Sequence, residues 1–130
     1  MNPYASPQAY RESSVLTASP EQLVVMLYDG VGRFLRQAEH LLREGGSYEQ
    51  AHERMNRGEA IIDELLATLD MDQGQIAERL QAIYVYCKRC LVDARADRDP
   101  DKVALVIRLL GELRDAWSQV AVSSAGAVVA

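Results

Sequence analysis

Apolar residues recur along this chain with the spacing of one helix face, in four successive segments. We expect helices over residues 19–44, 47–69, 75–97 and 99–121. In each segment the apolar positions return every three or four residues, which is the period of an amphipathic α-helix. No segment shows the sustained alternation of apolar and polar residues that indicates a strand. The pattern therefore predicts an all-α protein.

Residues that favour helix ends stand at the boundaries of these segments. Ser19 precedes Pro20 and lies three residues before Gln22, an arrangement typical of a capping box at a helix start. The pair Gly45-Gly46 ends the first helix, and Asp99-Pro100 starts the fourth. The connections between helices are therefore short, and short connections favour antiparallel neighbours.

These boundaries predict one domain rather than several, as the length of 130 residues also suggests. We expect an antiparallel up-down-up-down four-helix bundle over residues 19–121. Residues 1–18 sustain no helical period and are expected to form a mobile N-terminal arm. The small residues of 122–130 are expected to form a frayed C-terminal tail.

The first and fourth predicted helices carry more apolar surface than a small bundle needs. A bundle helix requires an apolar stripe somewhat wider than ~100°, whereas the apolar positions of the fourth helix span roughly 200°. This surplus is consistent with a groove for an apolar helix of another chain. It is equally consistent with self-packing or a self-dimer, and the periodicity leaves both open. The candidate binding residues on these two helices are Val24, Tyr28, Leu35, Leu105, Leu109 and Ala116.

Charge and composition narrow the classes of partner. The net charge is -5 and there is no basic cluster, which argues against nucleic acid or an anionic membrane as the main partner. No apolar run approaches the ~20 residues needed to span a bilayer. The amino terminus lacks the charged and apolar segments of a secretory signal, and the two cysteines suggest free thiols. We therefore expect a cytoplasmic protein without membrane insertion.

Two motifs with metal-ligand spacing lack the partners that their chemistry needs. Glu49 and His52 have the Glu-x-x-His spacing of di-iron bundles, but no second such pair exists. Both residues also lie in the first turn of a predicted helix, where an acidic residue favours the helix dipole. Cys87 and Cys90 form a C-x-x-C motif with no second pair to complete a zinc site. We interpret both thiols as buried apolar filler, and we expect no metal or cofactor.

His40 is the remaining candidate for catalytic chemistry, as the phosphoacceptor of a phosphotransfer bundle. Such a histidine stands in mid-helix, whereas His40 lies close to the predicted end of its helix, where it more often caps the final carbonyls. We therefore predict a binding protein rather than an enzyme.

Four segments, in the right order, resemble the flagellar secretion chaperone family FliS. The opening run Ala9-Tyr10, followed by Ser14-Val15-Leu16-Thr17-Ala18-Ser19-Pro20 and continuing through Met26-Leu27-Tyr28-Asp29-Gly30, is similar to the start of that family. The later matches are 60–65, 80–86 and the segment Leu110-Gly111-Glu112-Leu113-Arg114-Asp115-Ala116-Trp117. The resemblance covers residues 9 to about 121.

The resemblance implies a cytoplasmic chaperone that binds the carboxy-terminal segment of flagellin. Such a chaperone prevents premature polymerisation and delivers flagellin to the flagellar type III export apparatus. In the family, an N-terminal arm with a tyrosine like Tyr10 covers the binding surface until flagellin displaces it, and Leu16 would share that role here. A flagellar export gate component or a co-chaperone is a further candidate partner. The alternative is a generic helical adaptor or self-dimer without specificity for flagellin.

Overall fold

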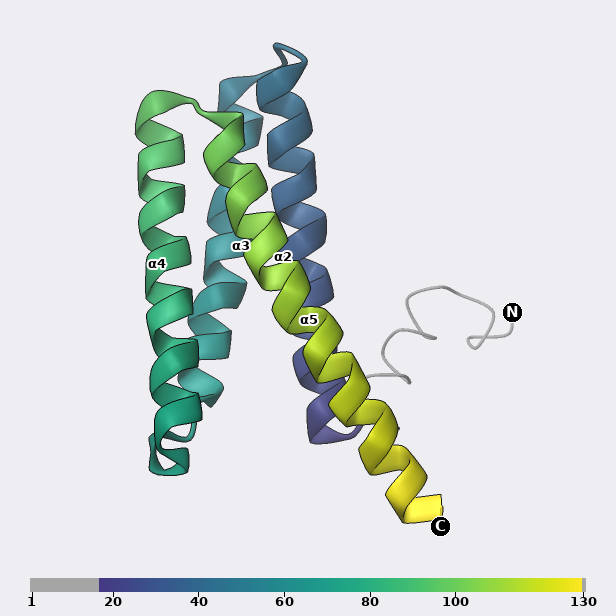
Figure 1. Ribbon diagram of the computed structural model, residues 1–130. Helices are drawn as coiled ribbons and strands as arrows, with labels where there is room; N and C mark the ends of the chain where they lie inside the picture. The colour runs from purple at the N-terminus through teal and green to yellow at the C-terminus, as the bar shows by residue number, and fades with distance from the viewer. Residues whose placement is uncertain (1–16, 130) are drawn as a thin grey trace, which may run out of the picture.

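The computed structural model describes residues 17–129, with side chains to residue 122. Over these residues the chain forms four long α-helices and one short 3-10 helix. They are α2 (Pro20–Arg43), α3 (Tyr48–Thr68), η2 (Met71–Gln73), α4 (Gln75–Asp97) and α5 (Pro100–Val129). The long helices alternate in direction and pack side by side (Figure 1). The predicted all-α, up-down-up-down bundle is confirmed.

The helix ends follow from local residues, as the sequence predicted. The Ser19 side chain accepts a hydrogen bond from the Gln22 backbone N–H, and the Gln22 side chain accepts one from the Ser19 N–H. The Ser47 side chain caps α3 by accepting a hydrogen bond from the Gln50 backbone N–H. Gly45 adopts φ 70°, in the left-handed region that a glycine enters without a Cβ clash, just after the end of α2.

α2 packs extensively against both α3 and α5, whereas α4 packs less extensively against its neighbours. Two glycines explain how closely α2 and α3 approach. A Cβ built on Gly58 would lie 2.8 Å from the Leu35 side chain, and one built on Gly30 would lie 3.1 Å from Ile61. The core is formed by buried side chains from all four helices. Its largest members are Tyr84, Leu35, Met55, Ile62, Leu65 and Leu91.

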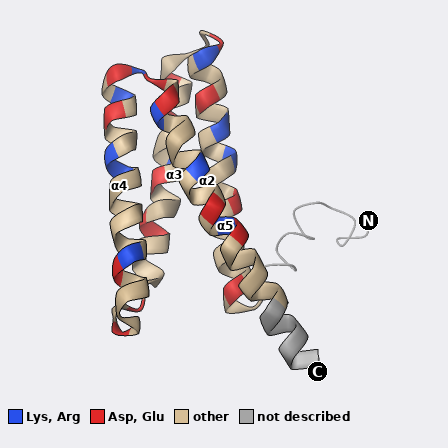
Figure 2. Cartoon of the chain, in the orientation of Figure 1, with Lys and Arg blue, Asp and Glu red and all other residues tan. Residues whose placement is uncertain are grey.

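Charged residues of both signs are interspersed along the helices (Figure 2). Several form ion pairs between neighbouring helices: Lys88 with Asp63 joins α4 to α3, and Arg43 with Asp101 joins α2 to α5. These side chains are substantially exposed, so each pair contributes modestly to stability, about 0–1 kcal/mol. Apolar packing therefore determines the arrangement of the helices.

The last helix is longer than the sequence predicted. Helix α5 continues to Val129 instead of ending near Ala121, and its last turns extend past the start of α2 (Figure 1). The small residues of the expected tail are compatible with helix, since alanine has the highest helix propensity. The predicted arm lies outside the described residues up to residue 16.

Candidate protein-binding site

One end of the bundle is open. At this end α2 and α4 begin, α3 ends, and α5 crosses diagonally and moves away from α4 (Figure 1). Helix α5 packs much more extensively against α2 than against α4. Because the two helices diverge, core-facing side chains of α4 near its start lack the cover that a closed bundle provides.

A cavity of about 430 Å³ lies at this end, and we call it the inner cavity. All four long helices contribute to its wall. Its apolar lining residues are Leu23, Val24, Leu27, Leu65, Leu69, Ile76, Ala77, Leu80, Tyr84 and Trp117. The remaining lining residues are Pro20, Thr68, Asp70 and Gln73, near the helix ends. The volume and the mostly apolar wall match sites that take apolar groups from a partner.

Ile76 marks the rim of the inner cavity. It lies four residues before Leu80 on α4, a spacing that places the two on the same side of the helix. Leu80 is half-buried against the core, whereas Ile76 is 70% exposed. Burying an isoleucine side chain completely stabilises by about 1.5–3 kcal/mol, so most of that gain remains available to a partner.

The tyrosines Tyr28 and Tyr84 form a hydrogen-bonded pair, and Tyr84 lies in the wall of the inner cavity. Their hydroxyl groups bond to each other between α2 and α4, and both side chains are 2% exposed. Burial raises the pKa of the Tyr28 hydroxyl far above its ordinary value, and the bond to Tyr84 raises it further. Burial likewise raises the pKa of Tyr84. The bond between the two hydroxyls joins α2 to α4 beside the inner cavity.

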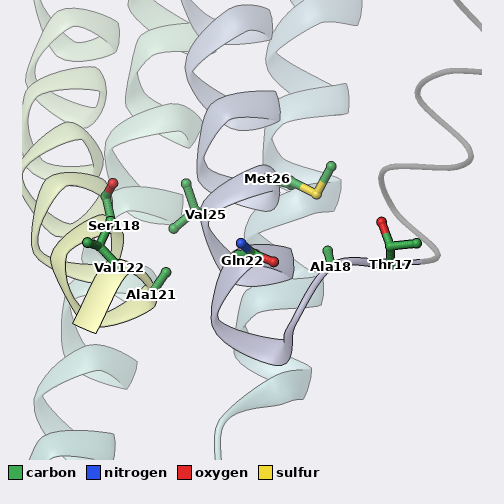
Figure 3. Close-up of a pocket in the computed structure, with 8 residues that line it drawn as sticks. All are labelled: Thr17, Ala18, Gln22, Val25, Met26, Ser118, Ala121 and Val122. Atoms are coloured by element: carbon green, nitrogen blue, oxygen red, sulfur yellow. The ribbon is translucent and has the colours of Figure 1, made fainter. Parts of the chain in front are cut away.

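A second hollow, of about 650 Å³, lies between the start of α2 and residues 118–122 of α5; we call it the outer groove. Figure 3 shows Ser118, Ala121 and Val122 projecting from α5 and Val25 projecting from α2 toward them. The other lining residues are Thr17, Ala18, Gln22 and Met26. Val122 is 70% exposed.

The inner cavity and the outer groove share the first turns of α2. Residues 23–27 read Leu-Val-Val-Met-Leu, so the helix is apolar on more than one side here. Leu23, Val24 and Leu27 line the inner cavity, whereas Val25 and Met26 line the outer groove. One short helical segment therefore presents apolar side chains to both surfaces.

Next to the outer groove, an exposed ion pair also joins α2 and α5. Arg114 donates a hydrogen bond to Asp29 over 2.8 Å, beside a smaller hollow of about 270 Å³ that Gly111 also lines. A Cβ built on Gly111 would meet nothing within 4 Å. Packing between helices therefore explains Gly30 and Gly58, but it does not require a glycine at position 111.

The candidate residues predicted from the sequence are distributed over core and surface. Tyr28 and Leu35 are buried in the core, 2% and 0% exposed. Val24 is half-buried in the wall of the inner cavity. Leu105 and Leu109 are half-buried against the core and line neither the inner cavity nor the outer groove. Ala116 is exposed on α5.

Tyr10 and Leu16, the candidates on the arm, lie outside the described residues. The structure also adds residues that the sequence prediction did not select: Leu65, Leu69, Ile76, Leu80 and Trp117. Leu65 belongs to α3, Ile76 and Leu80 belong to α4, and Leu69 directly follows α3. The prediction selected bundle residues only on the first and fourth helices, because these carry the apolar surplus. A usable signal was present, since Leu69 and Ile76 flank the polar break over residues 70–74.

The C-x-x-C motif lies on α4, and the Glu-x-x-His motif lies on α3. Cys87 and Cys90 are free and buried. Burial raises the pKa of Cys87 to about 12, and the neighbouring Cys90 adds to the shift, so the thiol is protonated and poorly nucleophilic. His52 stacks on the Tyr48 ring, with 5.9 Å between ring centroids. Among the described residues, no three His, Cys, Asp or Glu side chains gather to hold a metal ion.

Comparison with known proteins finds relatives along nearly the whole chain. The family model described as "Flagellar protein FliS" matches residues 2–124. The flagellar secretion chaperone FliS of Bacillus subtilis is 36% identical over 118 residues, covering 91% of this chain and 85% of that protein. The protein of the same name from Salmonella typhimurium is 36% identical over 111 residues, covering 84% and 82%. That of Campylobacter jejuni is 32% identical over 113 residues, covering 86% and 88%. In the described part of the chain, no helix has the length and apolar character to cross a membrane.

Proposed function

This chain belongs to the FliS family of flagellar secretion chaperones, and on that premise we propose that it binds the carboxy-terminal segment of flagellin at the open end of its bundle. The family is non-enzymatic, so the protein acts by binding. The proposed contact surface consists of the inner cavity and the outer groove.

The observation that carries this proposal is the apolar, incompletely covered inner cavity. A flexible segment that becomes ordered on binding loses conformational entropy, and broad apolar contact must offset this loss. The rim residues Ile76 and Leu23 are 70% and 37% exposed, and Trp117 supplies a large aromatic surface in the wall. An amphipathic helix with apolar residues three and four positions apart is the ligand that such a cavity fits.

The outer groove extends the surface to the other side of α2. A segment leaving the inner cavity past the first turn of α2, which carries Glu21, would reach Val25 and Met26 on the other side of the helix. The partner would then contact α2 from two sides. Contact over two separate apolar hollows gives a long, disordered segment more buried area than either hollow alone.

The biological consequence follows from covering that segment. While bound, the carboxy-terminal part of flagellin is not free to assemble, so the chaperone would prevent premature polymerisation in the cytoplasm and deliver flagellin to the type III export apparatus. In the empty protein, an arm with Tyr10 and Leu16 would compete for the same apolar surface and reduce the apparent affinity. An export gate component or a co-chaperone would then bind the complex of chaperone and flagellin.

The test is titration of the full-length chain with the carboxy-terminal flagellin segment of the same organism, followed by calorimetry. We expect a one-to-one complex with a negative heat capacity change, the signature of buried apolar area. A segment of the same composition in scrambled order is the control and should not bind. Equal binding of both segments would favour a generic adaptor, and absence of binding to the native segment would refute the proposal.

A further inference from the structure

Among the described residues that line the inner cavity, Asp70 is the only one that carries a charge. It follows Leu69 just after the end of α3 and caps the start of η2. The rest of the lining is apolar or uncharged. Asp70 is exposed, so its carboxylate is accessible to a partner that covers the cavity. A single negative charge at the edge of an apolar surface is a feature that the sequence of the partner must match.

The Asp70 carboxylate is held in a fixed orientation. Its Oδ1 atom accepts a hydrogen bond from the Asp72 backbone N–H over 3.0 Å, and its Oδ2 atom accepts one from the Gln73 side-chain amide over 3.2 Å. Both oxygens can still accept a further bond, because a carboxylate offers about four lone-pair positions. An oriented carboxylate loses less conformational entropy on pairing than a freely rotating one, and this loss is part of what makes exposed ion pairs weak.

No positive charge of the fold compensates Asp70. Its carboxylate forms no ion pair with any residue that the structure describes. Residues 20–27 and 65–80 contain almost all of the cavity lining, and their charged members are mostly acidic: Glu21, Asp70, Asp72 and Glu78, against the single basic residue Arg79. Figure 2 shows acidic residues at the start of α2 and at the connection between α3 and α4. The potential at the mouth of the cavity therefore favours a basic partner.

We propose that Asp70 selects the sequence that enters the inner cavity, by pairing with a lysine or arginine of the flagellin segment. This basic residue lies within one helical turn of the apolar residue that fills the cavity, because Asp70 directly follows Leu69 of the apolar wall. The pairing rests on the proposed function and adds the charge pattern of the ligand. A segment with a basic residue at this position gains a charge-assisted hydrogen bond when it covers the cavity. A segment with an apolar or acidic residue there leaves the carboxylate desolvated or repelled, so it is rejected.

Removing the charge of Asp70 without changing its shape tests the pairing. In the full-length Asp70→Asn variant the side-chain oxygen still accepts from the Asp72 N–H, and the Gln73 amide can rotate to accept from the new NH2 group. The fold should therefore be retained, which circular dichroism checks. We expect calorimetric titration to show about tenfold weaker binding of the native flagellin segment. The dissociation constant should also depend less on salt concentration, because one screened attraction is lost.

Asp72→Asn is the matched control. It makes the same change in net charge two residues away, but Asp72 is not part of the cavity lining. It should change the affinity by less than about twofold. An Asp70→Asn variant that binds like the wild type, or that loses no more affinity than Asp72→Asn, would overturn the role of Asp70 while leaving flagellin binding in place. If the wild-type protein does not bind the segment, the proposed function fails, and the role of Asp70 fails with it.

Variants of the flagellin segment identify the basic residue. Each lysine and arginine of the segment is changed singly to glutamine and titrated against the wild type and Asp70→Asn. One change should weaken binding to the wild type as much as Asp70→Asn does, and it should have no further effect on the Asp70→Asn variant, since both remove the same pair. Losses that simply add for every lysine and arginine would contradict direct pairing with Asp70.

Discussion

Replacing Ile76 with aspartate tests whether the inner cavity is the binding site. Ile76 is 70% exposed and is the second residue of α4. The fold gains little from this side chain, and a carboxylate in the first helical turn interacts favourably with the helix dipole, by about 0.3–1 kcal/mol. We therefore expect the Ile76→Asp variant to fold with a melting temperature close to that of the wild type.

The effect on flagellin binding should be large. Complete burial of isoleucine stabilises by about 1.5–3 kcal/mol, so covering the exposed 70% contributes about 1–2 kcal/mol. Ile76→Ala should therefore weaken binding by about 5- to 30-fold, since 1.4 kcal/mol corresponds to a factor of ten. Ile76→Asp adds the cost of an unpaired carboxylate at an apolar contact, at least about 2 kcal/mol, which raises the loss to about 100-fold or more.

Trp117 provides a direct assay, because it is the single tryptophan of the chain and lines the inner cavity. A tryptophan-free flagellin segment that fills the cavity should exclude water from the ring and shift its emission to shorter wavelength. Val92→Asp is the matched control: Val92 is 57% exposed on the same helix but lies outside the cavity. A folded Ile76→Asp variant that binds and shifts Trp117 emission like the wild type would refute the assignment of this cavity.

Three further outcomes follow from the structure. Gly111→Ala should raise the free energy of unfolding by about 0.5–1 kcal/mol, because an added Cβ meets no neighbour, whereas Gly58→Ala should lower it by about 1–3 kcal/mol, because its Cβ would clash with Leu35. Thermal denaturation of both variants checks this contrast, and a change of the same sign in both would contradict it. The free energy of unfolding should fall as pH rises above about 9, because the pKa of Cys87 is raised from 9.0 to about 12 in the folded protein and the unfolded thiol therefore ionises first. Urea titrations at increasing pH should show this loss, and Cys87→Ala should make the free energy of unfolding depend less steeply on pH. Arg114→Ala should change the melting temperature only slightly, since its ion pair with Asp29 is substantially exposed, and a loss above about 1 kcal/mol would contradict that interpretation.

Sequence patterns were sufficient to predict the four long helices and most of their ends. The Ser19 capping box and the Gly45 stop are local interactions, and a local rule suffices to predict them. The end of α5 was predicted less well, because the alanine and valine residues that follow Ala121 do not by themselves stop a helix. Local rules therefore succeed where a specific residue terminates the helix.

The division between core and binding surface could not be predicted in the same way. A helical wheel gives the direction of Leu35 but not the distance to the next helix, and Gly58 allows α3 to approach until Leu35 is sealed. Nor does the wheel give the crossing angle of α5, which opens one end of the bundle, where Ile76 is exposed. Leu105 and Leu109 lie where α5 is still packed on the bundle, so they contribute to the core instead.

The open end explains why the apolar surplus is compatible with a stable fold. The apolar run over residues 23–27 would leave exposed side chains in any four-helix arrangement, since one helix cannot bury all its sides against two neighbours. The structure gathers this surplus at one end, while the rest of α2 is held by Tyr28, Val31 and Leu35 in the core. Stability and binding thus depend on different turns of the same helix. Substitutions at the rim should therefore change affinity without unfolding the bundle, whereas substitutions in the sealed segment should remove both together.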